Sequence, residues 1–438
     1  MKNYAALIAL ILSFALTACG SDEAVKAPLK GDRLSIMELQ KTLEPDAANL
    51  QTAEVTVPNP WSNEFWPQAG GYPNHAMQNP SLAGTVKREW SADIGDGATK
   101  RFPLTASPIV VDGQIFTLDI DFSLRAFDTK TGKENWRTSI KSQFEKDPVI
   151  SGGIAFGEGL IFATNGYNEV LAVKPDDGKI VWRQLIPTPS RAAPTVMNGR
   201  VFVTTLDNRL IVLSTADGSS QWEYTGITET AGLVGAASPA ANNEIVVPVF
   251  TSGELTALRV QNGSVAWSDN LSSLQRFGGT SSISDIKALP VLDRGLVFAI
   301  SFGGRLVAID QRSGARVWQR DIAGANTPWI AGNHIFVLSA DNELVALSRE
   351  KGIIRWVTAL PKYENMEKKK GLIVWAGPVM AGGRLIATAT NGMVREIDPA
   401  TGETINTWNS KLPLSMPPII AAGTMYLLSD DGKLLAYR

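Results

Sequence analysis

A phrase that recurs along the chain limits the possible folds more than any other feature. It consists of a short apolar run, a polar stretch ending in Gly, and then a Trp, as in LAVKPDDGKIVW (171–182) and LVAIDQRSGARVW (306–318). A spacing of about 45 residues between repeats is typical of a β-propeller, in which each repeat is one four-stranded blade. The Trp of the phrase occupies eight positions: Trp90, Trp136, Trp182, Trp222, Trp267, Trp318, Trp356 and Trp408.

Residues 289–321 show the four predicted strands of one blade most clearly. LPVL, LVFAIS, RLVAID and ARVWQRDI are apolar or alternating runs, separated by DRG, GG and QRSG. Such runs between Gly and Asp are the signature of strands joined by hairpin turns, where Gly supplies a positive φ. We expect each first strand to open on a Pro, where a missing N–H is tolerated: Pro108, Pro148, Pro194, Pro239, Pro290, Pro328, Pro378 and Pro418.

The two ends of the chain decide the number of blades. The last unit (417–438) stops after its third strand, and the first unit, around Trp90, is a Trp strand with no three strands before it. Joining the two completes an eighth blade and leaves the ring without an open edge. The sequence therefore predicts an all-β fold over residues 81–438, an eight-bladed propeller of four-stranded antiparallel blades closed by pairing the N- and C-terminal strands.

The repeated residues are predicted to hold the fold together. Eight Trp at one period favour packing between adjacent blades over a row of ligand platforms, because a buried aromatic contributes a large apolar area. The Asp or Asn before each Gly, such as Asp177, Asp217 and Asn262, is interpreted as a turn residue.

The N-terminus has the pattern of an export signal. Lys2 precedes an apolar run (5–16) that is too short to span a bilayer, and LTACG (16–20) follows with the only Cys of the chain. This pattern resembles a bacterial lipobox, which implies cleavage before Cys19 and lipid attachment to it; an ordinary signal with an incidental Cys is the alternative. We predict a signal peptide over 1–18, a lipidated tether and pre-propeller segment over 19–80, and the propeller over 81–438.

Composition argues against several classes of function. With 41 basic and 43 acidic residues, the chain lacks the positive charge of a nucleic-acid-binding protein. It has only two histidines, His75 and His334, and no evident set of oxygen ligands for a hard cation. Neither catalytic residues nor a metal site is predicted.

The repeats resemble those of propellers that bind pyrroloquinoline quinone. Quinoprotein dehydrogenases of that class hold the quinone beside a disulfide of adjacent cysteines, which a chain with Cys19 alone cannot form. No cofactor and no enzymatic activity are therefore predicted, with a quinone-dependent periplasmic oxidoreductase as an alternative. A glycan-binding propeller is another alternative, which would use the aromatics Trp61, Trp66, Phe277 and Tyr363.

The chain is most similar in its features to the BamB family of outer-membrane assembly lipoproteins. The lipobox, the eight repeats without cofactor residues and the phrase WPQAGGYPNHAMQNP (66–80) together carry this resemblance. It implies a scaffold that is lipid-anchored at the periplasmic face of the outer membrane. Such a scaffold binds the POTRA domains of a BamA-type protein and aids the insertion of β-barrel proteins. Whether unfolded barrel proteins also bind stays open.

The resemblance also suggests partner-binding residues in two segments. In GLVGAASP (232–239), Leu233 matches the family and Val234 replaces its arginine. In SDIK (284–287), Ser284 and Asp285 match, and Lys287 replaces a second aspartate. The interval that contains 270–285 is among the two longest between Trp residues, and long loops on a rigid scaffold often bind partners.

The other long interval contains PKYENMEKKKG (361–371). We interpret this stretch as a solvated polar loop, whose Lys368–Lys370 run offers contact with an acidic partner as the alternative.

Overall fold

The computed structural model describes residues 43–46, 54–145, 147–228, 236–272 and 285–438. Every regular element among them is a β-strand. No helix in these described ranges is long and apolar enough to cross a membrane.

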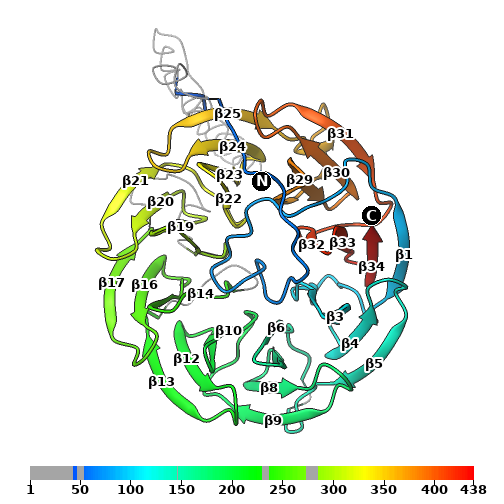
Figure 1. Cartoon of the computed structure of the whole chain (residues 1–438), viewed down its shortest axis with the longest axis vertical. Helices are drawn as coiled ribbons and strands as arrows, with labels where there is room; N and C mark the ends of the chain where they lie inside the picture. Colours follow the sequence, from blue (N-terminus) through cyan, green and yellow to red (C-terminus); the bar gives the residue numbers. More distant parts are fainter. Residues whose placement is uncertain (1–42, 47–53, 146, 229–235, 273–284) are drawn as a thin grey trace, which may run out of the picture. The chain divides into compact units, whose positions relative to one another are not determined.

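The strands of residues 88–437 form eight four-stranded antiparallel sheets arranged as a ring (Figure 1), which confirms the predicted propeller. Seven blades take four consecutive strands each. Blades 1 to 3 consist of β2 (Ile109–Val111), β3 (Gln114–Leu118), β4 (Ser123–Asp128), β5 (Glu134–Ser139); β6 (Ile154–Gly157), β7 (Leu160–Thr164), β8 (Glu169–Val173), β9 (Ile180–Leu185); and β10 (Thr195–Met197), β11 (Arg200–Thr204), β12 (Arg209–Ser214), β13 (Ser220–Thr225). Blades 4 to 7 consist of β14 (Ala240–Ala241), β15 (Ile245–Val247), β16 (Glu254–Arg259), β17 (Val265–Asn270); β18 (Val291–Asp293), β19 (Leu296–Ile300), β20 (Leu306–Asp310), β21 (Arg316–Arg320); β22 (Trp329–Ala331), β23 (His334–Leu338), β24 (Glu343–Ser348), β25 (Ile354–Ala359); and β28 (Trp375–Ala381), β29 (Arg384–Ala389), β30 (Met393–Ile397), β31 (Thr404–Asn409).

The eighth blade is built from both ends of the ring, as predicted. Its strands are β32 (Ile419–Ala421), β33 (Thr424–Leu428) and β34 (Lys433–Tyr437), and β1 (Arg88–Asp93) pairs with β34. Trp90 lies opposite Ala436 and Ser91 opposite Leu435 in this register. A separate hairpin, β26 (Tyr363–Asn365) with β27 (Lys370–Leu372), belongs to no blade.

Seven of the eight Trp lock one blade to the next. Trp136 donates its indole N–H to the carbonyl of Pro175 at 2.8 Å, in the turn between the last two strands of blade 2. Trp90, Trp182, Trp222, Trp267, Trp318 and Trp356 make the equivalent hydrogen bond. The predicted packing role of these residues is confirmed.

Trp408 is the exception, because the blade that follows it has no turn between its last two strands. β34 ends the chain and β1 begins the ring, so no turn carbonyl is available to Trp408. Its indole N–H instead donates to Glu396 at 2.9 Å, and its ring packs on Tyr437.

Two of the eight prolines depart from the predicted position. Six directly precede a first strand, but Pro148 lies six residues before β6 and Pro378 lies within β28. The register of β28 against β29 shifts between Ala376 and Val379, so the ladder is interrupted where Pro378 has no N–H to donate.

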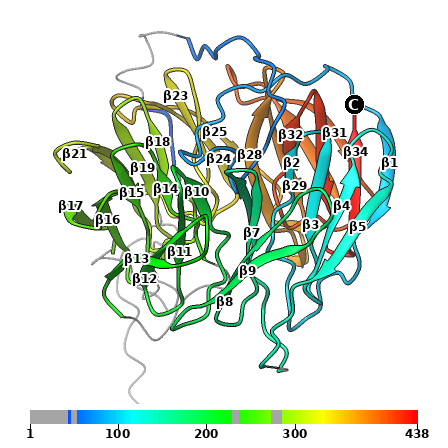
Figure 2. The ribbon, with the colours of Figure 1, turned by 60° about the horizontal axis from the view of Figure 1, so that its bottom comes forward.

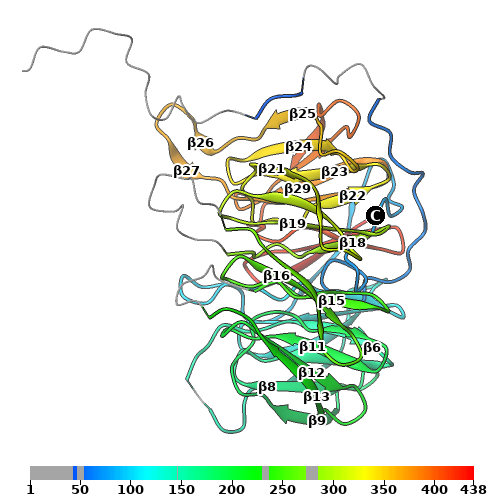
Figure 3. The same cartoon turned by 90° about the vertical axis from the view of Figure 1, so that its left-hand side faces the viewer.

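Antiparallel pairing gives the ring two different faces. The turns between first and second strands and between third and fourth strands lie on one face. The connections from one blade to the next lie on the opposite face, named here the connection face. Figure 3 shows the ring from its side: residues 54–80, in blue, lie on the right and hairpin β26–β27 on the left.

Residues 54–80, named here the collar, run across the first of these faces at the centre of the ring (Figures 1 and 2). The innermost strand of every blade has an unpaired edge, whose N–H and C=O groups need partners. The collar makes a hydrogen bond with the inner edge of each blade. The bonding collar residues, taken in chain order, are Asn63 (to blade 8), Trp66 (blade 1), Pro67 (blade 2), Gln68 (blade 3), Pro73 (blade 4), Asn74 (blade 5), Gln78 (blade 6) and Pro80 (blade 7). This part of the predicted tether segment is therefore packed against the propeller.

Candidate functional site

The segments predicted to bind a partner fall, in sequence, between the last strand of one blade and the first strand of the next. Residues 226–239 join blade 3 to blade 4, and residues 271–290 join blade 4 to blade 5. Leu233, Val234 and Ser284 lie outside the described residues. Asp285 and Lys287 are the two predicted residues that the structure places.

Asp285 and Lys287 differ in their surroundings. Asp285 is only 4% exposed, and its carbonyl accepts a hydrogen bond from the Phe302 N–H at 3.0 Å. Its neighbour Ile286 is also buried, whereas Lys287 is exposed. Desolvation by the surrounding protein lowers the pKa of the Lys287 amine, while the charge of Asp285 acts in the opposite direction. Of the two residues, Lys287 therefore has the more accessible side chain, and Asp285 is buried.

The stretch interpreted as a solvated polar loop (361–371) is largely exposed but has regular structure, and exposed apolar side chains lie in it and directly after it. β26 and β27 form a hairpin in the connection from blade 6 to blade 7, with Tyr363 opposite Leu372. Met366, Leu372 and Val374 are exposed. This hairpin lies on the connection face, together with Lys287.

The collar changes the interpretation of the pre-propeller aromatics. Trp66 is 2% exposed and stacks on Trp329, with ring centroids 6.3 Å apart, so it offers no surface to a glycan. Trp61 stays partly exposed and packs against Tyr72. Of the aromatic residues predicted for glycan binding that the structure describes, Trp61 and Tyr363 remain accessible.

The collar residues also bear on the quinone of the dehydrogenase propellers. Trp66 and Met77 are buried and belong to one hydrophobic cluster with residues of blades 1, 6, 7 and 8. The described ranges contain no group of three or more His, Cys, Asp or Glu placed to hold a metal ion. With Cys19 as the only cysteine, the chain also cannot supply a disulfide of adjacent cysteines. These residues do not fit the quinone site of that class.

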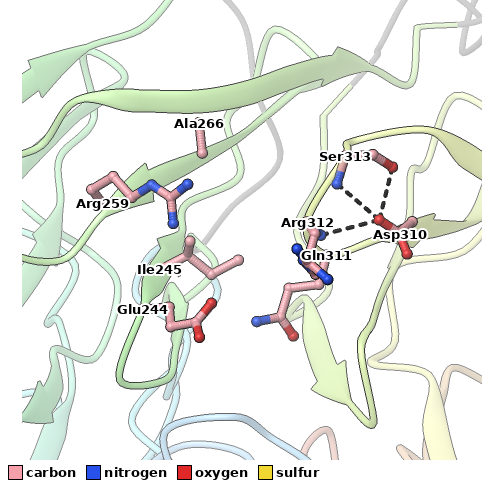
Figure 4. A pocket seen from close by; sticks show the side chains of 8 residues that line it. All are labelled: Glu244, Ile245, Arg259, Ala266, Asp310, Gln311, Arg312 and Ser313. Carbon is pink, nitrogen blue, oxygen red and sulfur yellow. Dashed lines mark hydrogen bonds between the residues drawn. The ribbon is translucent and has the colours of Figure 1, made fainter.

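A pocket of about 860 Å³ opens between blades 4 and 5 (Figure 4). Blade 4 contributes Glu244, Ile245, Arg259 and Ala266, and blade 5 contributes Asp310, Gln311, Arg312 and Ser313. The Asp310 carboxylate accepts hydrogen bonds from the backbone N–H and the hydroxyl of Ser313, at 2.8 and 2.7 Å, and these bonds lower its pKa. Asp310 thus serves the turn, and the pocket contains none of the residues predicted for partner binding.

Solved structures of similar fold fall into two groups. BamB from Moraxella catarrhalis superposes with a TM-score of 0.64 at 16% identity, covering 81% of this chain and 98% of that chain. A quinohemoprotein alcohol dehydrogenase from Comamonas testosteroni superposes with a TM-score of 0.65 at 12% identity, covering 85% of this chain and 80% of that chain. At these identities both show the fold alone, and they place the chain in the class of β-propellers.

Sequence comparison narrows the class to a family. The family model described as outer membrane protein assembly factor BamB matches residues 83–156 and 121–358, and the chain belongs to this family. A relative from Yersinia pestis, named outer membrane protein assembly factor BamB, is 23% identical over 80% of this chain and 88% of its own. One from Escherichia coli K12 with the same name is 24% identical over 80% of this chain and 88% of its own.

Sequence reasoning missed the collar and the hairpin. The collar carried a signal, because 66–80 contains two adjacent glycines and also Gln68, Asn74 and Asn79, whose amide groups hydrogen-bond backbone carbonyls elsewhere. Gly70 and Gly71 have φ of 72° and 97°, and a Cβ there would meet His75 at 2.9 Å and Met77 at 2.2 Å, respectively. The sequence of the hairpin gave a weaker indication of β-structure, because its charged residues outnumber its few apolar ones.

Proposed function

We propose that the chain is a non-catalytic scaffold of the machinery that assembles outer-membrane β-barrel proteins. It is held at the periplasmic face of the outer membrane by a lipid on Cys19 and binds the POTRA domains of a BamA-type protein. The family match over residues 83–358 carries this proposal, because relatives named as outer membrane protein assembly factors align with most of the chain.

The structure supports a scaffold through the contrast between its two faces. The collar contacts all eight blades and buries the centre of one face. The connection face carries the hairpin β26–β27, whose side chains are largely exposed, and Lys287, in the connection from blade 4 to blade 5, is exposed too. A rigid ring with accessible loops suits the binding of a partner domain better than the enclosure of a small substrate.

Affinity capture tests the proposed partner. A tagged full chain, expressed in its own cells and extracted in mild detergent, is expected to recover a BamA-type protein. Lys287→Glu is expected to lower the yield without changing the melting temperature, because Lys287 is exposed. Lys133→Glu is the matched control, since Lys133 is an exposed lysine in a turn on the opposite face. A functional tagged copy that recovers no such protein contradicts the proposal.

Cell fractionation tests the anchor. Cys19→Ser is expected to remove the chain from the outer-membrane fraction, because the lipid on Cys19 supplies the anchor. Mass spectrometry of the wild-type N-terminal peptide should show a diacylglyceryl group and an additional acyl chain on Cys19. An unmodified peptide that begins elsewhere would contradict the assignment.

A further inference from the structure

The hairpin β26–β27 presents one side chain row that is free of acidic groups. Tyr363 pairs with Leu372 and Asn365 with Lys370, and residues directly opposite in a two-stranded sheet share a side. Glu364 alternates to the other side, beside Gly371, where a Cβ would meet its carboxylate. One side of the hairpin is therefore apolar near its base and basic toward its tip.

The apolar part of this side is exposed to solvent and does not pack against the ring. Leu372 is 66% exposed and Val374 52%. An isolated two-stranded hairpin is marginal by itself, so its conformation depends on its attachment to the ring. The attachment is firm, because Ile373 is buried and donates its N–H to the Lys362 carbonyl, and Trp375 donates its indole N–H to the Pro361 carbonyl at 2.9 Å.

The basic part is not neutralised within the described residues. Lys368, Lys369 and Lys370 are exposed and make no ion pair there, whereas Lys362 at the base lies 3.6 Å from Asp341. Unpaired lysines beside an apolar patch complement a surface that combines carboxylates with apolar side chains. The positions of the charges argue against insertion into lipid, because the turn that would enter first carries Glu367, Lys368 and Lys369, while Leu372 and Val374 lie toward the base.

We propose that this side of the hairpin docks onto an acidic, partly apolar surface of a partner protein. This inference rests on the proposed function, since the partner is the BamA-type protein. It adds a second contact on the connection face, at the connection between blades 6 and 7, apart from the connections that follow blades 3 and 4. The apolar patch supplies buried area, and the lysines set orientation and the rate of association.

Site-specific photo-crosslinking in cells tests the contact. With p-benzoyl-phenylalanine incorporated at Leu372 of the full chain, we expect an adduct with the periplasmic part of the BamA-type protein. The same group at Val317 is the matched control, because Val317 is 49% exposed on β21 at the outer rim. We expect no such adduct from Val317.

Charge reversal tests the lysines. Lys368→Glu, Lys369→Glu and Lys370→Glu combined are expected to lower the affinity for purified POTRA domains about tenfold at low salt, because three individually weak attractive contacts become repulsive ones. The loss should shrink as salt is added. Leu372→Ser, which removes apolar area instead of charge, should weaken binding at every salt concentration. Melting temperatures should not change in either variant.

The outcomes separate this inference from the proposed function. A wild-type chain that captures no BamA-type protein overturns both. Normal capture with no Leu372 adduct, or with affinity unchanged in both variants, overturns the hairpin contact and leaves the scaffold proposal in place. Adducts of Leu372 with lipid alone also overturn it.

Discussion

The Gly before each fourth strand is fixed by two constraints at the scale of a single residue. Gly263 has a φ of +73°, which an L side chain rarely adopts, and a Cβ there would lie 2.5 Å from the Trp222 ring. Six other turn glycines meet a Trp of the preceding blade in the same way: Gly132, Gly178, Gly218, Gly314, Gly352 and Gly402. Gly and Trp therefore recur together because they form one interblade contact.

Substitution of two glycines separates these constraints. Gly159→Ala should lower the free energy of unfolding by about 1–2 kcal/mol, since its φ is +75° but a Cβ there would meet nothing within 4 Å. Gly263→Ala should cost a further ~1–3 kcal/mol, because the methyl group displaces Trp222. Thermal and denaturant unfolding of both variants measure the difference. Equal losses would show that the indole contact imposes no constraint of its own.

Trp408, which bonds no turn carbonyl of the next blade, donates its indole N–H into a buried ion pair within blade 7. Arg384 donates to Glu396 at 2.8 Å, both side chains are 6% exposed, and Glu396 also accepts the Trp408 N–H. Glu396→Gln should destabilise the chain by about 3–5 kcal/mol, because it leaves a buried guanidinium uncompensated. Asp177→Asn, at the exposed pair with Lys179, should leave the melting temperature unchanged. Comparable losses in the two variants would contradict the argument.

At the scale of elements, the collar contains a buried titratable group. His75 donates its Nδ1–H to the Pro290 carbonyl at 2.7 Å, and burial lowers its pKa to about 4. The collar therefore holds a neutral imidazole against blade 5. In the unfolded chain the same imidazole has its ordinary pKa of about 6.5.

This difference predicts a pH dependence. Because the folded pKa lies below the unfolded one, the unfolded chain binds the proton first, and stability falls as the pH drops from about 6.5 toward 4. The shift corresponds to a loss on the order of 3 kcal/mol from His75. His75→Gln should reduce the loss of melting temperature between pH 7 and pH 4.5. Burial also lowers the pKa of His334, so the melting temperature of the variant should still fall with pH, but less steeply than in the wild type. A slope identical to wild type would contradict the role of His75.

At the scale of the whole molecule, closure depends on six residues at the C-terminus. β34 is hydrogen-bonded on one side to β33 and on the other to β1, and Leu434, Leu435 and Ala436 are fully buried. Removing 433–438 should abolish cooperative thermal unfolding, because β1 then has no partner and blade 8 has an open edge. Replacing the hairpin turn 366–369 should leave the transition unchanged, since that hairpin belongs to no blade. Circular dichroism and calorimetry provide the measurements.

Most of the fold could be predicted, because its information is local and repeated. Strand alternation, turn glycines and the Trp period recur in each unit, so errors at single positions such as Pro148 and Pro378 did not affect the count of blades. The closure between β1 and β34 followed from the incomplete units at the two ends. The candidate site is not repeated, and only Asp285 and Lys287 of its predicted residues lie in the described part.

Sequence by itself thus determined the all-β ring, its eight blades and the interblade role of seven Trp, because periodic signals add up over many copies. Tertiary structure alone decided which residues face a partner. It buried Asp285 and exposed Lys287 two residues away, packed the collar against all eight blades, and left Leu372 in water on a hairpin. Each of these outcomes depends on contacts between segments far apart in the chain, such as Gln68 with Val196 or Gln78 with Gly332, and no local pattern specifies such contacts.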